Sequence, residues 1–180
     1  MTGIICSGFG GQGVLTMGLI LANTAMLAGN EVTWIPSYGA EMRGGTANCS
    51  IKISDEPIAS PYVNKIDVLI AMNEPSLKKF ENDVVPGGMI IVNSSIVKEA
   101  VGRSDVKVVE VHANDIAVEL NNLRAINLIV LGTFVGATSV LTKDDMANGI
   151  VKYFEKKNID NTLNLQAFEK GFAVGEAQKG

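Results

Sequence analysis

The sequence predicts an α/β fold, a Rossmann-like layered domain with a mainly parallel sheet, one or more antiparallel strands and a helical C-terminal part. Short apolar runs of strand length alternate with segments of helical pattern through the first two thirds of the chain. A glycine-rich stretch directly follows the first of these runs, and after about residue 120 only helical patterns remain. The length of 180 residues and the lack of any linker predict one domain over 1–180, with right-handed crossovers.

The N-terminal elements form a strand, loop, helix and strand. Residues 3–7 (GIICS) are a short apolar run, typical of a strand inside a parallel sheet. Residues 13–28 predict a helix that is apolar on nearly every face, so we expect it to be covered on most sides. A glycine and an asparagine then stop the helix. A second strand begins at EVTWIP, residues 31–36, and we expect its proline to end it.

The middle of the chain adds strands to the sheet. Residues 46–54 (TANCSIKIS) alternate apolar and polar side chains, which indicates a half-buried strand, antiparallel or at an edge. Residues 66–72 (IDVLIAM) predict a buried strand, and residues 73–80 (NEPSLKKF) a short helix opened by its proline. Two more strands are predicted at GGMIIVN, residues 87–93, and VKVVEV, residues 106–111.

The C-terminal third is predicted to be helical. Residues 113–120 suit one or two helical turns. The uncharged segment 125–142 has 18 residues and contains polar side chains, which is marginal for the roughly 20 residues of a membrane span. We expect a helix buried in a soluble core instead. Thr142 and Asp145 form a capping box for the next helix. The last helix is amphipathic and uses Leu165, Phe168 and Phe172.

Composition excludes several classes of function. Hydrophobic residues make up 47% and charged residues 19%, as in well-packed globular proteins. The net charge of −4 comes without a basic cluster, so neither nucleic acid nor a membrane surface is an expected partner. The uncharged first 30 residues lack the basic start of a secretory signal, and we expect a cytoplasmic protein.

The metal-ligating residue types are few. Cys6 and Cys49 lie in separate strand patterns without a C-x-x-C arrangement, which indicates buried free thiols and no disulfide, zinc or iron–sulfur site. His112 is the only histidine and has no cysteine near it, so we expect a structural or surface role. No metal site is predicted.

The stretch GFGGQGVL has the G-x-G-x-x-G spacing of a dinucleotide-binding loop, from Gly8 to Gly13. Such a loop needs an acidic residue at the end of the second strand to bind a ribose hydroxyl. Glu31 begins that strand instead, Tyr38 follows its end, and only Arg43 could accept a 2′-phosphate. NAD binding is therefore disfavoured. In the alternative interpretation, the glycines serve close packing and present backbone to another ligand.

A second loop, SYGAEMRGGTANC, is expected at the same carboxyl edge of the sheet. It mixes Tyr38, Glu41 and Arg43 with three glycines, more than a structural turn needs. A Glu41–Arg43 pair on a solvated turn is the alternative. The candidate cofactor-binding or subunit-facing residues are Gly8, Gly10, Gly11, Gln12, Gly13, Ser37, Tyr38, Glu41, Arg43, Gly44, Gly45 and Thr46. No catalytic residue is predicted.

Together with IDVLIAMNEP and GGMIIVNSS, these two loops resemble the gamma subunit of 2-oxoacid:ferredoxin oxidoreductases over most of the chain. The resemblance implies a subunit, inactive alone, of an enzyme of anaerobic metabolism. That enzyme converts pyruvate, 2-oxoglutarate or a branched-chain 2-oxoacid with coenzyme A into acyl-CoA, CO2 and reduced ferredoxin. It also implies alpha, beta and possibly delta subunits as partners, with ferredoxin as acceptor.

The implied cofactors are thiamine diphosphate, Mg2+ and iron–sulfur clusters. The chain lacks a Gly-Asp-Gly motif upstream of its Asn121-Asn122 pair and has only two cysteines, so the resemblance places these cofactors in the partner subunits. The two loops are expected to pack against the catalytic subunits and help enclose the coenzyme A or cofactor region. The alternative function is a free-standing Rossmann-type nucleotide- or flavin-binding module.

Overall fold

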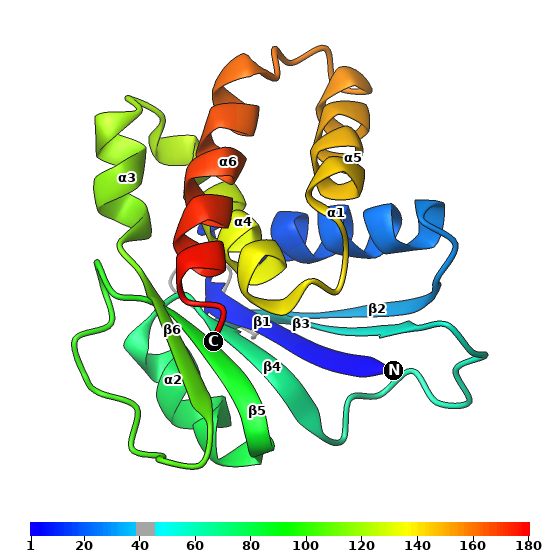
Figure 1. Ribbon diagram of the computed structural model, residues 1–180, viewed down its shortest axis with the longest axis vertical. Helices are drawn as coiled ribbons and strands as arrows, with labels where there is room; N and C mark the ends of the chain where they lie inside the picture. Colours follow the sequence, from blue (N-terminus) through cyan, green and yellow to red (C-terminus); the bar gives the residue numbers. More distant parts are fainter. Residues whose placement is uncertain (39–45) are drawn as a thin grey trace.

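The computed structural model describes residues 1–38 and 46–180, without the side chain of Tyr38. Within this part, six strands form one sheet in the order β2-β3-β1-β4-β5-β6 (Figure 1). The strands are β1 (Thr2–Phe9), β2 (Glu31–Tyr38), β3 (Thr46–Ser54), β4 (Ile66–Ala71), β5 (Val84–Asn93) and β6 (Lys107–Val111).

The sheet is mainly parallel with one reversed strand. β1, β4, β5 and β6 run parallel to one another. β3 is antiparallel to both of its neighbours, β1 and β2. The predicted fold class is therefore confirmed.

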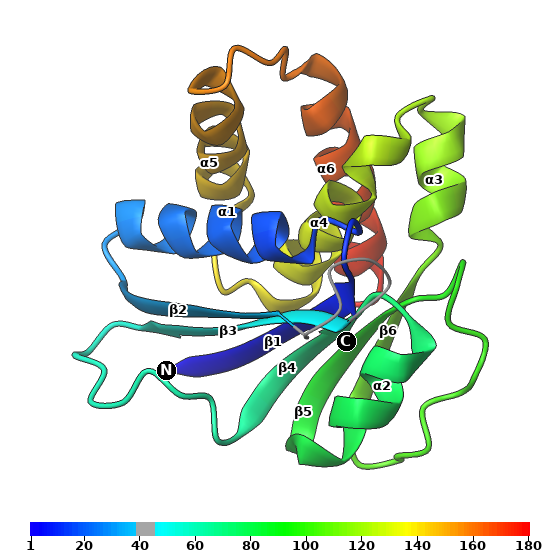
Figure 2. The same ribbon diagram turned by 180° about the vertical axis from the view of Figure 1, so that it is seen from behind.

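The sequence predicted that β3 is antiparallel or at an edge. The antiparallel alternative is confirmed, and β3 lies inside the sheet rather than at its edge. The side chains of β3 alternate between buried and partly exposed because helices cover the two faces of the sheet differently. The residues that face α1, such as Cys49 and Ile51, are fully buried, whereas Asn48 and Ser50 on the opposite face are partly exposed. On that opposite face the described residues form one α-helix, α2, which packs against β4 and β1 rather than β3 (Figure 2).

The sequence predicted that Pro36 ends the second strand, and this prediction is wrong. β2 continues through Tyr38, and Pro36 pairs with Cys49 of β3. Proline is tolerated because β2 is the edge strand, where one side of the backbone has no partner strand and a missing N–H breaks no ladder bond.

The helices cover the two faces unequally. One face carries α1 (Val14–Leu27), α3 (Ala113–Glu119), α4 (Ile126–Thr138), α5 (Lys143–Glu155) and α6 (Thr162–Ala177), and the other carries α2 (Glu74–Phe80) (Figures 1 and 2). Two short 3-10 turns, η1 (Glu81–Asp83) and η2 (Leu123–Ala125), complete the described elements. No helix among the described residues has both the length and the apolar character needed to cross a membrane.

The predicted helix starts are confirmed. The hydroxyl of Thr142 accepts a hydrogen bond from the Asp145 backbone N–H at 3.1 Å and donates one to the Asp145 carboxylate at 2.6 Å. At α2, the side chain of Asn73 accepts from the Ser76 N–H at 2.9 Å, and Pro75 lies in the first turn. Both caps satisfy backbone donors that a helix N-terminus would otherwise leave free.

α4 is the buried helix predicted for the uncharged segment, and every residue from 127 to 137 is buried. It packs against α6, whose Phe168 is fully buried, through glycines on both helices. A Cβ on Gly132 would lie 2.1 Å from the Phe168 carbonyl oxygen, and one on Gly171 would lie 1.8 Å from that of Ile129. The two backbones approach this closely only because the contact residues have no side chain.

Candidate functional site

The side chain of Gln12 organises the glycine loop between β1 and α1. Its Oε1 accepts hydrogen bonds from the Phe9 backbone N–H at 2.6 Å and from Asn73 Nδ2 at 3.2 Å. Its Nε2 donates to the Met72 carbonyl at 3.4 Å. Gln12 thus joins the end of β1 to the end of the neighbouring strand β4.

This junction is the switch point of the sheet. α1, which follows β1, lies on one face, and α2, which follows β4, lies on the other (Figures 1 and 2). Open α/β sheets bind ligands in the crevice at the carboxyl ends of such strands. Here the Gln12 side chain itself occupies the crevice between the two strand ends.

Two glycines of the loop are required for packing. A Cβ on Gly8 would lie 2.6 Å from Gln12 Oε1 and 2.8 Å from Val14 Cγ2. Gly13 adopts a left-handed φ of 74° as the N-cap of α1, and a Cβ there would lie 2.7 Å from Asn127 Nδ2. The close-packing interpretation is therefore correct for these two positions. Gly11, at the exposed tip of the loop, has a φ of 94°, and no described residue would lie within 4 Å of a Cβ added there.

The sheet order argues against a dinucleotide site. In a Rossmann unit the second strand lies beside the first, so that its terminal carboxylate reaches the ribose. Here β3 separates β2 from β1. Glu31 begins β2, opposite Ser54, at the far end of the strand from the glycine loop. The prediction that Glu31 opens the strand is confirmed.

The ends of the two candidate loops meet at the carboxyl edge. Ala47 of β3 lies opposite both Gly8 of β1 and Tyr38 of β2, and Thr46 lies opposite Phe9. Ser37 is exposed near the end of β2. The structure therefore brings Thr46 next to the glycine loop, whereas Ser37 lies at the same edge of the sheet with β3 between it and β1. Glu41, Arg43, Gly44 and Gly45 lie outside the described residues.

A cavity of about 370 Å³ opens beside the tip of the glycine loop. It is lined by Gly11, Gln12, Gly13, Ile96, Asn114, Leu123, Arg124 and Ile126. Sequence reasoning missed its far wall, which η2 and α3 contribute. The only signal was Arg124, the last charge before the uncharged helix α4.

Arg124 lies where its positive charge does not stabilise α4, the helix that follows it. It directly precedes the N-terminus of α4, whose dipole disfavours a positive charge. Its side chain is exposed and forms no hydrogen bond or ion pair with any residue of 1–38 or 46–180. Both the Arg124 side chain and the N-terminus of α1 favour anionic groups, so the cavity is suited to bind one.

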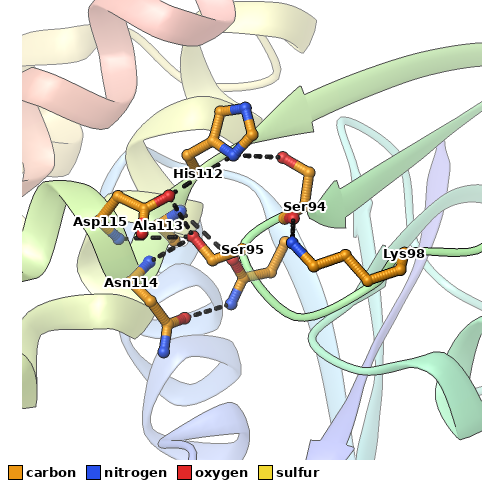
Figure 3. A network of polar contacts seen from close by, with 8 residues as sticks. Ser94, Ser95, Lys98, His112, Ala113, Asn114 and Asp115 are labelled. Atoms are coloured by element: carbon orange, nitrogen blue, oxygen red, sulfur yellow. Dashed lines mark hydrogen bonds and ion pairs between the residues drawn. The ribbon is translucent and has the colours of Figure 1, made fainter.

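Beyond this cavity, a polar network joins the ends of β5 and β6 (Figure 3). Ser94 Oγ lies 3.3 Å from His112 Nδ1, and Asp115 Oδ2 lies 3.6 Å from the same nitrogen. An activated serine needs its hydroxyl and the carboxylate on opposite ring nitrogens. This arrangement is therefore no nucleophile relay, and the exposed His112 has the surface role that the sequence predicted.

The network instead fixes α3 to β5. Ser95 Oγ accepts the backbone N–H of Asn114 at 3.1 Å, and Asn93 Oδ1 accepts that of Ala113 at 3.2 Å. Asn93 Nδ2 donates to the Asn114 side chain at 2.8 Å. These bonds hold Asn114 at the wall of the cavity.

The two cysteines are free and buried, as predicted. Among the described residues, no three His, Cys, Asp or Glu side chains lie close enough together to hold a metal ion.

The family and the individual relatives that match this chain agree with one another. Residues 3–174 match the protein family described as pyruvate ferredoxin/flavodoxin oxidoreductase. The chain is 40% identical over 167 residues to the ketoisovalerate oxidoreductase subunit VorA of Methanothermobacter thermautotrophicus, covering 92% of this chain and 34% of VorA. It is 34% identical to the 2-oxoglutarate synthase subunit KorC of Methanocaldococcus jannaschii, covering 94% of this chain and 91% of KorC. The chain thus spans about a third of VorA and nearly all of KorC.

Solved structures share the fold. The gamma subunit of a keto/oxoacid ferredoxin oxidoreductase from Geobacter sulfurreducens has a TM-score of 0.81 at 26% identity, covering 98% of this chain and 99% of that one. The 2-oxoglutarate:ferredoxin oxidoreductase of Magnetococcus marinus has a TM-score of 0.87 at 24% identity, covering 98% of this chain and 31% of that one. The latter likeness bears on the fold alone.

Proposed function

This chain belongs to the pyruvate ferredoxin/flavodoxin oxidoreductase family, and from that premise we propose that it is the gamma-type subunit of a 2-oxoacid:ferredoxin oxidoreductase. The observation that carries the proposal is the end-to-end match to a protein named as a separate subunit, with 94% of this chain and 91% of KorC aligned. The assembled enzyme would oxidatively decarboxylate 2-oxoglutarate, pyruvate or a branched-chain 2-oxoacid with coenzyme A, giving acyl-CoA, CO2 and reduced ferredoxin. The chain alone would be inactive.

The cofactors of this reaction belong to the partner chains in this proposal. An iron–sulfur cluster takes four ligands, as a rule cysteine thiolates, and the two cysteines of this sequence are buried together in the sheet. Thiamine diphosphate, Mg2+ and the clusters are therefore assigned to the alpha, beta and delta subunits. Those cofactors supply the carbanion and electron-transfer chemistry when bound.

The carboxyl edge of the sheet is the proposed contact with the catalytic subunits. The exposed tip at Gly10 and Gly11, the cavity beside it and Arg124 lie at this edge. Thr46 is adjacent to the loop, and Ser37 lies farther along the same edge. Arg124 and the N-terminus of α1 would hold an anionic group of coenzyme A, or a carboxylate of a partner chain. Tyr38, Glu41, Arg43, Gly44 and Gly45 remain candidates on sequence grounds.

The alternative, a free-standing nucleotide- or flavin-binding module, is not favoured. The strand β3 separates the two strands that would hold a dinucleotide, and Gln12 fills the crevice.

The proposal is tested by tagging the chain in its native host and purifying it gently without air. Viologen or ferredoxin reduction is then assayed with coenzyme A against a panel of 2-oxoacids. We expect larger subunits that carry thiamine diphosphate and iron–sulfur clusters to co-purify, and one 2-oxoacid to drive reduction. A chain that purifies alone with a bound nucleotide would contradict the proposal and revive the alternative.

A further inference from the structure

The two cysteines of the chain face each other across two neighbouring strands. Cys6 of β1 lies directly opposite Cys49 of β3 in the antiparallel ladder. Directly opposite residues point to the same face of a sheet, and both side chains are fully buried under α1. The sequence placed them 43 residues apart, in two strands whose pairing it did not predict.

The backbone spacing at this pair suits a covalent bond between the sulfurs. Opposite residues of an antiparallel ladder have Cα atoms about 4.5–5.5 Å apart. Disulfides span Cα distances of about 4.4–6.8 Å. The two side chains point to the same face of the sheet from opposite positions, so joining the sulfurs needs a rotation of side chains and no change of strand register.

We propose that Cys6 and Cys49 are a redox-active dithiol that hydrogen peroxide oxidises to a disulfide between β1 and β3. The Cys49 thiolate attacks one peroxide oxygen, the O–O bond breaks, and water leaves after protonation, which gives a sulfenic acid on Cys49. The Cys6 sulfur then attacks the Cys49 sulfur, and a second water leaves. In sum, two thiols lose two electrons and two protons to one peroxide, which becomes two waters.

The surroundings of the pair assign the first step to Cys49. A hydrogen bond from the Cys6 thiol and the adjacent Trp34 indole N–H lower the pKa of Cys49, against the opposing effect of burial. The same hydrogen bond and burial raise the pKa of Cys6. In the described structure the Trp34 Nε1 is buried without a hydrogen bond of good geometry, so a thiolate on Cys49 would give this donor a partner.

The proposed disulfide would tie together the strands that carry both candidate loops. β1 leads from Cys6 into the glycine loop, and β3 begins at Thr46, three residues before Cys49. α1 lies directly above, because a Cβ on Gly18 would lie 2.3 Å from the Cys49 sulfur. Oxidation would therefore constrain the ends of both loops at the carboxyl edge of the sheet. Because both sulfurs are buried, the reaction depends on local opening and is slower than at an exposed thiol.

The test uses the full chain, purified and fully reduced under argon. Hydrogen peroxide is added for increasing times and removed with catalase, and the chain is unfolded in iodoacetamide for intact-mass measurement. Trp34 is the only tryptophan and lies beside Cys49, so its fluorescence reports on the same site in the folded chain. Cys6→Ala and Cys49→Ala are treated in parallel, with circular dichroism as a check that each variant folds.

We expect a monomeric product that takes up no iodoacetamide, weighs two hydrogens less than the reduced chain and has quenched Trp34 fluorescence. Dithiothreitol should reverse both changes. In Cys6→Ala, Cys49 should stop at a sulfenic acid that dimedone traps, while Cys6 in Cys49→Ala should react more slowly than Cys49 does in Cys6→Ala. Independent sulfinic acids on either cysteine, a disulfide between two copies, or a disulfide formed only after unfolding would each overturn the proposal. The intact mass of the oxidised wild-type chain shows whether the disulfide forms, even if a variant fails to fold.

Discussion

At the scale of single residues, Gln12 determines the shape of the glycine loop. Its amide satisfies the Phe9 N–H, the Met72 carbonyl and Asn73 together. A phosphate at a dinucleotide loop would need the space and the donors that Gln12 uses. The loop therefore has the glycine spacing of a nucleotide site but a different occupant.

Gln12→Ala should destabilise the chain. It leaves the Phe9 N–H and the Asn73 amide without their partner, which costs about 1–3 kcal/mol for groups away from water. Urea unfolding followed by circular dichroism measures the change. Gln166→Ala, at an exposed position of α6, is the matched control and should change stability by less than about 0.5 kcal/mol. Equal effects of the two substitutions would show that the Gln12 contacts contribute nothing.

Arg124→Ala separates a functional role from a structural one. Removing a cation from the N-terminus of α4 should leave the free energy of unfolding unchanged or raise it by about 0.3–1 kcal/mol. The assembled enzyme should nevertheless show a roughly tenfold higher KM for coenzyme A or weaker subunit binding, because a charged hydrogen bond contributes about 1.5–3 kcal/mol. Lys156→Ala, exposed after α5, is the control. Normal assembly and an unchanged KM in Arg124→Ala would remove Arg124 from the site.

At the scale of elements, the pair α4 and α6 depends on glycines. A Cβ on Gly171 would lie 1.8 Å from the Ile129 carbonyl oxygen, and one on Gly175 would lie 2.1 Å from that of Thr133. Backbone atoms cannot rotate away as a side chain does, so the helices would have to separate.

Gly171→Ala should therefore lower the free energy of unfolding, by about 1–3 kcal/mol or more, even though alanine favours helices. The measurement is thermal and urea unfolding. Gly102→Ala is the matched control, because its nearest neighbour would be 3.9 Å from the added Cβ. It should be neutral or slightly stabilising. A stabilised Gly171→Ala would mean that the two helices pack less closely than described.

Local patterns in the sequence predicted most elements, but not their neighbours. β3 begins at Thr46 and ends at Ser54, as its alternation indicated. The alternation reports which side chains are buried and carries no information on which strands pair, so it left open whether β3 is an antiparallel strand inside the sheet or an edge strand. The end of the second strand was wrongly predicted at Pro36 for the same reason. A proline is tolerated within β2 only because β2 is an edge strand, and the local pattern does not show which strand is at the edge.

The candidate site was only half predictable. The glycine loop and its packing follow from a local motif. The cavity beside it joins residues as distant in sequence as Gly11 and Arg124. No local pattern links them, because the contact exists only once α4 has packed against α1. The Cys6–Cys49 pair likewise needed the strand order to be known.

At the scale of the whole molecule, the two faces of the sheet share their strands. Ile4 of β1 belongs to the core under α1, whereas Ile5, the next residue, belongs to the core under α2. Neither core can lose its packing without affecting the strands of the other. This sharing supports the single domain over 1–180 that the length and the lack of a linker predict.

We therefore expect one cooperative unfolding transition. Far-ultraviolet circular dichroism, Trp34 fluorescence and calorimetry should give coincident midpoints, with the calorimetric and van't Hoff enthalpies equal. Trp34 reports on the α1 face alone, while circular dichroism reports on every element. Two separated transitions would contradict the single domain.

In the proposed function, this chain completes an oxidoreductase without catalysing the reaction itself. The most direct measurement is reconstitution without air, in which the chain is titrated into its catalytic subunits while ferredoxin reduction is followed with 2-oxoacid and coenzyme A. We predict no activity from the chain alone, little from the catalytic subunits alone, and saturation at one chain per catalytic unit. Full coenzyme A-dependent activity from the catalytic subunits without this chain would contradict the account.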